Sequence, residues 1–319
     1  MKVIPASFEI QDELDRQSLA VRIEACGRIC YKSEEKISGD SATPFIKAII
    51  KHGHNSVTEM GVITLRLEFD PESLAHKFMA TQPRFMQIDR PERGKMLITG
   101  SVRAYRELFR EHPSDKLIKG MVAFLGRRYP LFFEDLTPRH GWMEQTGVAV
   151  SKLNLAQVGK LPADQLARHR YVGVKFITNR AVTHEIVRHR PCSFLQESQR
   201  YCRYSEDKFG SEVTFIRPLF FEEESGEYRL WEKAMADTEK IYLKLLKTSS
   251  PQAARTVLPN SCKTEIIVYA NLMEWRHIFR LRTTQAAEPS MREVMIPLLH
   301  AFGKRYPAQF GDLSRSLAG

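Results

Sequence analysis

Alternation of apolar and polar residues marks the strands of this chain most clearly. In residues 63–69 every second side chain is apolar, and a similar alternation returns in residues 171–177. A period of two places successive side chains on opposite faces of a sheet, so both segments are predicted to be strands. Short apolar runs at residues 213–216 and 266–269 predict two further strands, the second rich in β-branched residues.

Apolar residues spaced three and four positions apart predict the helices. The first is expected over residues 14–31, and the next begins at Thr43, which is placed to cap it, and ends at Gly53. Asn179 and Asn271 are placed to cap two later helices, because their side chains can accept hydrogen bonds from a first helical turn. The further predicted helices cover residues 180–187, 228–245, 251–258, 272–281 and 289–304.

Residues 71–168 form a long segment that is predicted to be mainly helical. Ser101 is placed to cap one of its helices and Ser114 the next, and apolar residues at helical spacing follow each serine. No catalytic pattern lies in this segment. It is therefore predicted to be a structural insertion within a single domain that spans residues 1–319.

The order of the predicted elements indicates the fold class. Strands and helices follow one another without the regular βαβ order of a doubly wound sheet, which predicts an α+β fold with a mixed or antiparallel sheet packed against helices. No GxGxxG follows a predicted strand, so a flavin would be held without the Rossmann turn. The helix over residues 228–245 is expected to direct its apolar side, including Ile241, into the core.

Length and composition favour a soluble globular protein. The chain has 319 residues, and the 43% of them that are hydrophobic are enough for a substantial core. No apolar run approaches the roughly 18 residues that a membrane-spanning helix needs, and the first residues lack the apolar stretch of a secretory signal. A cytoplasmic protein without a membrane partner is therefore expected.

Cysteine and histidine spacing does not predict a metal site. The five cysteines are an odd number without CxxC spacing, which is typical of reduced thiols. His52 and His54 lack a third ligand at a recognisable spacing. His184 and His189 are five residues apart, so on a helix their side chains point about 140° from each other, unlike the two histidines of HExxH. No metal is expected.

A net charge of +10 predicts anionic partners, for which phosphorylated cofactors and nucleic acid both qualify. The cations are densest around Arg188, His189 and Arg190. Pro191 disfavours a helical conformation of the residue before it, so this triplet is predicted to lie at a helix end and continue into a loop.

The residues of this stretch also allow two other functions, thiol catalysis and nucleic-acid binding. Cys192 follows a proline among arginines that are expected to lower its pKa, which is compatible with thiol catalysis, although a packed thiol in a turn is favoured. Arg200 and Arg203 add cations that nucleic acid could use, but Glu185 and Glu197 are interleaved with them and no aromatic platform surrounds them. Nucleic acid is therefore not the expected partner.

The stretch resembles the signature of a known enzyme family. Arg188-His189-Arg190, followed by Ser193, Ser198 and Arg200-Tyr201, is similar to the pattern of the flavin-dependent thymidylate synthases. Downstream, the segment Ala254–Pro259 and the pair Leu281-Arg282 resemble two further motifs of that family, and His54, Ser56 and Glu59 resemble an N-terminal one. The resemblance covers most of the chain outside the insertion.

The resemblance implies a function and a set of site residues. Members of that family convert dUMP to dTMP with FAD, NADPH and methylenetetrahydrofolate, and they are homotetramers. Arg282, expected just past the helix that ends at Leu281, would be catalytic by stabilising the ionised N3 edge of dUMP. The residues implied to bind FAD are Ser56, Arg188, His189, Arg190, Gln196, Asn271 and His277. The residues implied to bind dUMP are Glu185, Arg188, Gln196, Glu197, Ser198, Gln199, Arg200, Arg255 and Arg282.

The chain departs from the family pattern at a few positions. Leu195 stands where asparagine is usual, and so does His277. Glu185 and Gln196 exchange the glutamine and glutamate that the family often has there, which keeps one carboxylate and one amide. These departures leave open a related flavin-dependent hydroxymethylase of pyrimidine nucleotides, and a non-catalytic protein that binds nucleotides or nucleic acid is the alternative outside the enzymes.

Overall fold

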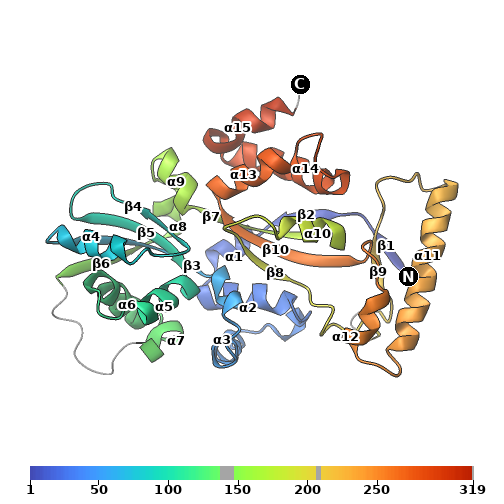
Figure 1. Ribbon diagram of the computed structural model, residues 1–319, viewed down its shortest axis with the longest axis horizontal. Coiled ribbons are helices and arrows are strands. Elements are labelled where there is room, and N and C mark those ends of the chain that lie inside the picture. Colours follow the sequence, from blue (N-terminus) through green and yellow to red (C-terminus); the bar gives the residue numbers. More distant parts are fainter. Residues whose placement is uncertain (137–146, 206–209, 318–319) are drawn as a thin grey trace. The chain divides into compact units, whose positions relative to one another are not determined.

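The computed structural model describes residues 1–136, 147–205 and 210–317 (Figure 1). The chain divides into two compact units. The first consists of Met1–Gln11, Gly27–Glu34 and Gly173–Gly319, and the second of Asp12–Cys26 and Glu35–Val172. Both units combine sheets with helices, so the predicted α+β class is confirmed.

The first unit is built on a four-stranded sheet in the order β2-β7-β10-β8. In this sheet β2 pairs with β7 and β10 pairs with β8, and both pairs are antiparallel. A separate two-stranded ladder joins β1 and β9 in parallel. The strands are β1 Lys2–Ile4, β2 Ser7–Ile10, β7 Tyr171–Asn179, β8 Ser193–Gln196, β9 Thr214–Ile216 and β10 Lys263–Asn271.

Helices follow these strands along the chain of the first unit. They are α10 Arg180–Ile186, α11 Gly226–Leu245, α12 Pro251–Ala254, the 3-10 turn Arg255–Val257, α13 Leu272–Arg282, α14 Pro289–Arg305 and α15 Pro307–Ser316. The last three, drawn in orange to red in Figure 1, pack against one another.

Aromatic packing fixes α13 on the sheet. The ring of Trp275, which is fully buried, lies 5.7 Å from that of Phe279 and 5.4 Å from that of Phe302 on α14. On its other side it contacts Phe176 of β7, with 6.4 Å between ring centroids. Side chains of this size dominate burial energetics, at roughly 150–250 Å² each. The position of α13 is therefore set by the core.

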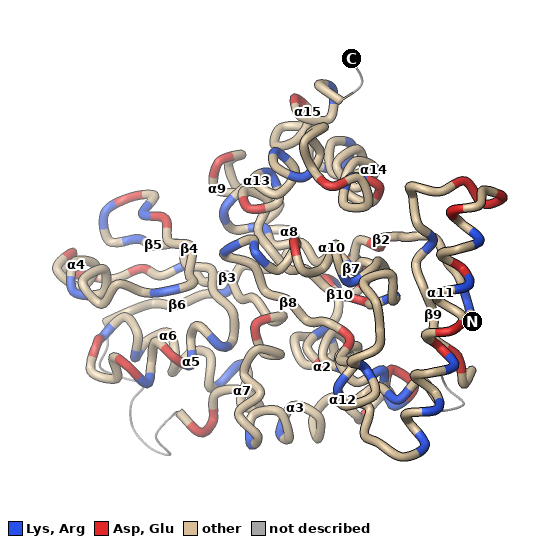
Figure 2. The backbone as a smooth tube through the Cα atoms, turned by 45° about the vertical axis from the view of Figure 1, so that its right-hand side comes forward, with Lys and Arg blue, Asp and Glu red and all other residues tan. Residues whose placement is uncertain are grey.

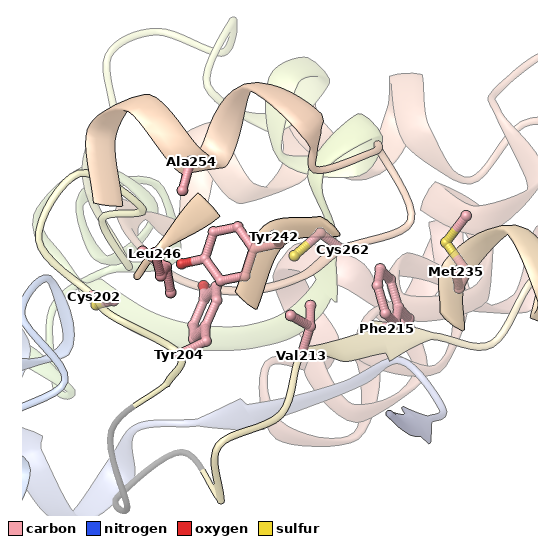
Figure 3. Close-up of a cluster of buried hydrophobic side chains, with 9 residues drawn as sticks. All are labelled: Cys202, Tyr204, Val213, Phe215, Met235, Tyr242, Leu246, Ala254 and Cys262. Atoms are coloured by element: carbon pink, nitrogen blue, oxygen red, sulfur yellow. The ribbon is translucent and has the colours of Figure 1, made fainter. Parts of the chain in front are cut away.

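A second cluster of the first unit lies around α11 and the chain that follows β8 (Figure 3). Tyr204 and Tyr242 face each other with their ring centroids 5.8 Å apart. Val213, Phe215 and Cys262 complete the contact between this pair and the strands. The cluster thereby holds the segment beyond Arg200 against the body of the unit.

The second unit contains an antiparallel sheet in the order β4-β5-β3-β6. Its strands are β3 Val62–Phe69, β4 Met86–Asp89, β5 Lys95–Ser101 and β6 Val148–Leu153. Its helices include α1 Asp12–Arg16, α2 Leu19–Ile29, α3 Ala42–Lys51, α4 Ser73–Ala80, α5 Val102–Glu111, α6 Lys116–Arg128, α7 Pro130–Phe133, α8 Leu155–Val158 and α9 Ala163–His169. α5 and α6 contact β5 and β6 and lie along one side of the sheet (Figure 1).

A chain of buried polar groups ties this sheet to α9. The hydroxyls of Thr64 and Thr99 are 2.8 Å apart, and Thr99 contacts Nδ1 of His169 at 2.8 Å. Nε2 of His169 lies 3.1 Å from a carboxylate oxygen of Asp89, which also accepts from Arg168. Each of these four buried or half-buried side chains thus has a partner, which keeps the cost of burying it low.

Most strands and helices predicted from periodicity are present. The strands predicted at residues 63–69, 171–177, 213–216 and 266–269 are confirmed as β3, β7, β9 and β10. Asn179 and Asn271 cap their helices, each accepting from the backbone N–H three residues on. Gly53 ends α3 with a positive φ of 70°, and the N–H of His54 bonds to the carbonyl of Ile49, as in a Schellman motif.

Several elements were missed. The segment 71–168 contains the helices expected of it but also β4, β5 and β6, which are too short or too mixed in pattern to stand out. β8 and α15 were not predicted, and the expected helix over residues 14–31 is two helices.

Some positions were assigned wrongly. α3 begins at Ala42, so Thr43 does not cap it, and α6 is capped by the side chain of Asp115, not by Ser114. Ile241 is 52% exposed because it falls on the outer side of α11. Arg282 is the last residue of α13, so the helix extends one residue further than expected.

The described helices include none that is long and apolar enough to cross a membrane. Basic and acidic residues alternate along α11, where blue and red segments follow each other in Figure 2. Residues of both charge signs therefore follow one another in the sequence of this helix.

The observed caps give a direct test of the local structure of the second unit. Ser101 accepts a hydrogen bond from the N–H of Ala104, and Asp115 accepts one from Ile118. Ser101→Ala and Asp115→Ala should each lower the free energy of unfolding by about 1 kcal/mol, measured by urea denaturation. Ser114→Ala, one position from the real cap, should change it by less than about 0.5 kcal/mol. Equal losses for Ser114 and Asp115 would contradict this assignment.

Candidate active site

The signature stretch lies on two elements of the first unit, α10 and β8. Asn179 Oδ1 accepts from the N–H of Val182 at 2.9 Å and so begins α10. After α10 the chain turns through residues 187–192 and enters β8, so the loop predicted to follow the triplet is in part a strand. β8 pairs with β10, with Leu195 opposite Ile267. Leu195 is buried there, which accounts for an apolar residue at this position of the motif.

Arg282 is held in a fixed orientation by two residues of the signature stretch. Its Nε–H donates to Nε2 of His189 at 2.9 Å, and Nη1 donates to a carboxylate oxygen of Glu185 at 2.6 Å. Nη2 makes only a long contact, 3.5 Å, with the carbonyl of Glu185. A guanidinium is planar, so two fixed nitrogens set the direction in which the third can donate.

His189 is a neutral acceptor in this arrangement. The residue is 5% exposed, and burial together with the charge of Arg282 and the nearby His277 lowers its pKa to about 4. At neutral pH the ring therefore carries one proton. Because Arg282 donates to Nε2, the hydrogen-bond network assigns this proton to Nδ1.

Glu274 and His277 extend the cluster on the same helix as Arg282. One ligand atom from each of His189, Glu274 and His277 lies within 4.8 Å of the other two. The rings of His189 and His277 meet edge to face, with centroids 6.0 Å apart. Burial raises the pKa of Glu274, against a smaller effect of His277 in the opposite direction. Sequence reasoning missed Glu274, although the Glu-x-x-His spacing of residues 274–277 puts both side chains on one helix face.

A second polar cluster anchors the end of β8. Glu197, whose side chain is 1% exposed, accepts from the hydroxyl of Tyr204 at 2.8 Å and from Nζ of Lys263 at 2.9 Å. Lys263 also donates to Glu265 at 2.6 Å. Burial alone would raise the pKa of Glu265, but Lys263 and Lys32 outweigh it and lower that pKa to about 2. Glu265 is therefore charged, and both carboxylates are paired with Lys263 inside the unit.

The remaining residues of this stretch differ in what they contact. Nε2 of Gln196 donates to the hydroxyls of Thr183 and Thr264, at 3.0 and 3.2 Å. Gln199 is buried and donates to Sγ of Cys262 at 3.4 Å, whereas Arg200 is exposed and its guanidinium lies 5.4 Å from the ring centroid of Tyr201. Thr264 and Lys263 could not be found from the motif, because their contacts depend on the pairing of β8 with β10.

The structure brings only part of the predicted site residues together. Glu185, His189, His277 and Arg282 meet in one cluster, and Gln196, Glu197, Ser198, Gln199 and Arg200 follow one another from the end of β8. Arg188 and Arg190 are exposed, and no described residue forms a hydrogen bond or ion pair with either side chain.

Three more of the predicted residues lie on other elements. Asn271 is buried and caps α13 through the N–H of Glu274 at 2.8 Å. Arg255 is half-buried at the start of the 3-10 turn after α12. Ser56 belongs to the second unit, where it is exposed on the 3-10 turn Asn55–Met60.

The expectation that arginines lower the pKa of Cys192 is wrong. The thiol is largely desolvated, and burial raises its pKa well above the ordinary value, with a further contribution from Glu274. A thiolate is the reactive form of cysteine, so this environment disfavours Cys192 as a nucleophile.

The signature stretch thus carries a neutral histidine and two exposed cations, and Arg282 of α13 donates to this stretch. The chain matches the sequence model of the family described as thymidylate synthase complementing protein over residues 15–87 and 151–308. That match covers more than half of the chain, and the chain therefore belongs to this family. Residues 88–150, which carry β5, α5, α6 and α7, lie between the matched parts.

Curated relatives of the chain are named flavin-dependent thymidylate synthase. The chain is 39% identical over 128 residues to the flavin-dependent thymidylate synthase of Pyrococcus abyssi, a stretch that is 40% of this chain and 52% of the relative. It is 33% identical to that of Corynebacterium efficiens over 42% of this chain and 58% of the relative. With that of Corynebacterium aurimucosum it shares 29% over 61% of this chain and 79% of the relative. The chain thus spans about half the length of the first of these relatives.

The environment of His189 predicts an unusual titration. An ordinary histidine has a pKa near 6.5, so the unfolded chain takes up a proton below that pH while folded His189 stays neutral to about pH 4. The contribution of His189 to the free energy of unfolding therefore falls as the pH is lowered from about 6.5 to about 4. NMR titration of the imidazole should give a pKa near 4, and Arg282→Ala should raise it. Titration of His189 near 6.5 in the unchanged protein would contradict the arrangement.

Proposed function

We propose that the protein is a flavin-dependent thymidylate synthase. It would methylate dUMP to dTMP reductively, with methylenetetrahydrofolate as carbon donor and NADPH-reduced FAD as hydride source. The observation that carries this proposal is the fixed guanidinium of Arg282, held by His189 and Glu185 at the position where the family signature meets the Leu-Arg motif. Membership of the family favours the synthase over the hydroxymethylase and over non-catalytic binding.

The residues near the signature are suited to a flavin. FAD when bound would supply the hydride for the reaction. Arg188 and Arg190 are exposed cations suited to its phosphates, and His189 offers an Nδ1–H donor. Glu274 adds a buried carboxylate oxygen that has no partner among the described residues. Together with Gln196, Asn271 and His277, these residues would form the cofactor site of the first unit, and a role of Ser56 stays a prediction from the resemblance.

Arg282 would act on dUMP by electrostatics. A guanidinium stays charged at any working pH, so it cannot transfer a proton but can stabilise negative charge on the N3 edge of the uracil ring. Glu185 and His189 hold two of its nitrogens, which fixes the fork before the substrate arrives and lowers the cost of ordering it. The residues Gln196 to Arg200, with Arg188 and Arg255, would bind the nucleotide, and Arg200 and Arg255 are suited to its phosphate.

Glu197 would contribute to this site through its neighbours. Its carboxylate is already bonded to Tyr204 and Lys263, so it fixes the turn that presents Ser198 and Arg200. A homotetramer in the cytoplasm and NADPH as reductant stay predictions that rest on the resemblance and on the sequence.

Flavin content and NADPH oxidation test the proposal. The purified protein should be yellow, or become so when FAD is added, and should oxidise NADPH faster when dUMP is present. A protein that resists loading with flavin, or whose NADPH oxidation ignores dUMP, would contradict it. Salt-sensitive binding to DNA without flavin would instead favour the non-catalytic alternative.

The role of Arg282 predicts a contrast between two arginines of α13. Arg282→Ala should lower turnover by at least about 100-fold while FAD stays bound, since the lost group acts on the nucleotide. Arg280→Ala removes the same charge two residues away from an exposed position and should leave turnover nearly unchanged. Steady-state kinetics and flavin absorbance measure both effects.

A thiol mechanism gives the opposite pattern of losses. Cys192→Ala should be nearly silent, because burial keeps this thiol protonated. If Cys192→Ala abolished turnover while Arg282→Ala did not, the electrostatic role of Arg282 would be wrong.

A further inference from the structure

Three side chains near Arg282 have the arrangement of metal ligands. Glu274 and His277 are three residues apart on α13, a spacing that places both on one face of a helix, and His189 reaches the same point from the turn after α10. Their ligand atoms all lie within 4.8 Å of one another. The Glu-x-x-His spacing is also the one by which helices supply ligands in di-metal carboxylate proteins.

The environment of the Glu274 carboxylate indicates that this cluster binds a ligand. The residue is 8% exposed, and its Oε1 atom is buried with no hydrogen-bond partner among the described residues. A buried acceptor that lacks a partner costs roughly 1–3 kcal/mol, and more when it is charged. A cation placed between this oxygen and the two imidazoles would satisfy it.

We propose that His189, Glu274 and His277 bind a divalent transition-metal ion of the zinc class. Two imidazole nitrogens and one carboxylate oxygen are a ligand set that suits Zn²⁺ and Co²⁺, and three protein ligands leave a fourth position open to water. Hard cations such as Mg²⁺ prefer oxygen ligands and are excluded by the two histidines.

Metal binding and the contact of His189 with Arg282 exclude each other. If the metal takes Nε2, it replaces the N–H of Arg282 directly. If it takes Nδ1, the ring proton must move to Nε2, which then faces the donor N–H of Arg282. In both cases the guanidinium of Arg282 loses the hydrogen bond to His189, one of the two that orient it, and gains a cationic neighbour. The site is therefore inhibitory, a consequence that rests on the proposed role of Arg282 in turnover.

The proposed metal site depends on His277, a residue that distinguishes this chain from the family pattern. The resemblance places asparagine at this position in the family, and asparagine is a poor ligand for zinc. His277→Asn should therefore remove the metal site while it restores the side chain that is usual where flavin binds. This variant tests the metal site, and its FAD content and metal-free rate are measured beside it.

Cobalt spectroscopy on the full-length protein tests the proposal. Co²⁺ added without flavin should give visible d–d absorption at one equivalent, and Glu274→Gln and His277→Asn should each weaken binding at least about 10-fold. His184→Asn, which alters an exposed histidine at the end of α10, should bind Co²⁺ as the unchanged protein does. Circular dichroism checks that each variant is folded. No cobalt spectrum, or a loss with His184→Asn and not with His277→Asn, would overturn the assignment.

Inhibition gives the second readout. Zn²⁺ should inhibit NADPH oxidation in the presence of dUMP, and His277→Asn, measured against its own metal-free rate, should show an inhibitory concentration at least about 10-fold higher. Equal inhibition of both proteins would overturn the inhibitory role. If neither protein turns over, the cobalt result still decides whether the metal site exists, so the two proposals fail separately.

Discussion

The hydrogen bond from Arg282 to a neutral His189 is the interaction on which the site depends. It requires a histidine that stays unprotonated, which burial and the adjacent guanidinium provide. It also requires Glu185 to hold the other side of the fork, at 2.6 Å. An imidazolium at position 189 would repel Arg282. The orientation of the arginine therefore requires the low pKa of the histidine.

The fold supplies the positions that this contact needs. Packing of Trp275 against Phe176 fixes α13 on β7, and Asn271 begins that helix, so Arg282 comes at a defined distance eleven residues later. From the other side, pairing of β8 with β10 fixes the chain after the triplet. The paired carboxylates Glu197 and Glu265 then hold the end of β8 against Lys263. Glu185 and Gln196, which exchange the residue types usual in the family, have separate partners: Arg282 for Glu185, and Thr183 and Thr264 for Gln196.

The sequence predicted the α+β class, the caps at Asn179 and Asn271 and the family, since these depend on local spacing or on short motifs. It missed β8, because four residues inside a charged stretch have no period to detect. It also missed Glu274 and Lys263, whose importance comes from what folding brings beside them. The prediction of a low pKa for Cys192 was wrong for the same reason. Burial of the thiol in the folded protein raises its pKa more than arginines nearby in the sequence lower it.

The most direct test of the account is the mass of the nucleotide formed from dUMP in the presence of FAD, NADPH and methylenetetrahydrofolate. The unchanged protein should form a product with the mass of dTMP, and Arg282→Ala should not. A hydroxymethylated nucleotide, or dUMP recovered unchanged from flavin-loaded protein, would contradict it.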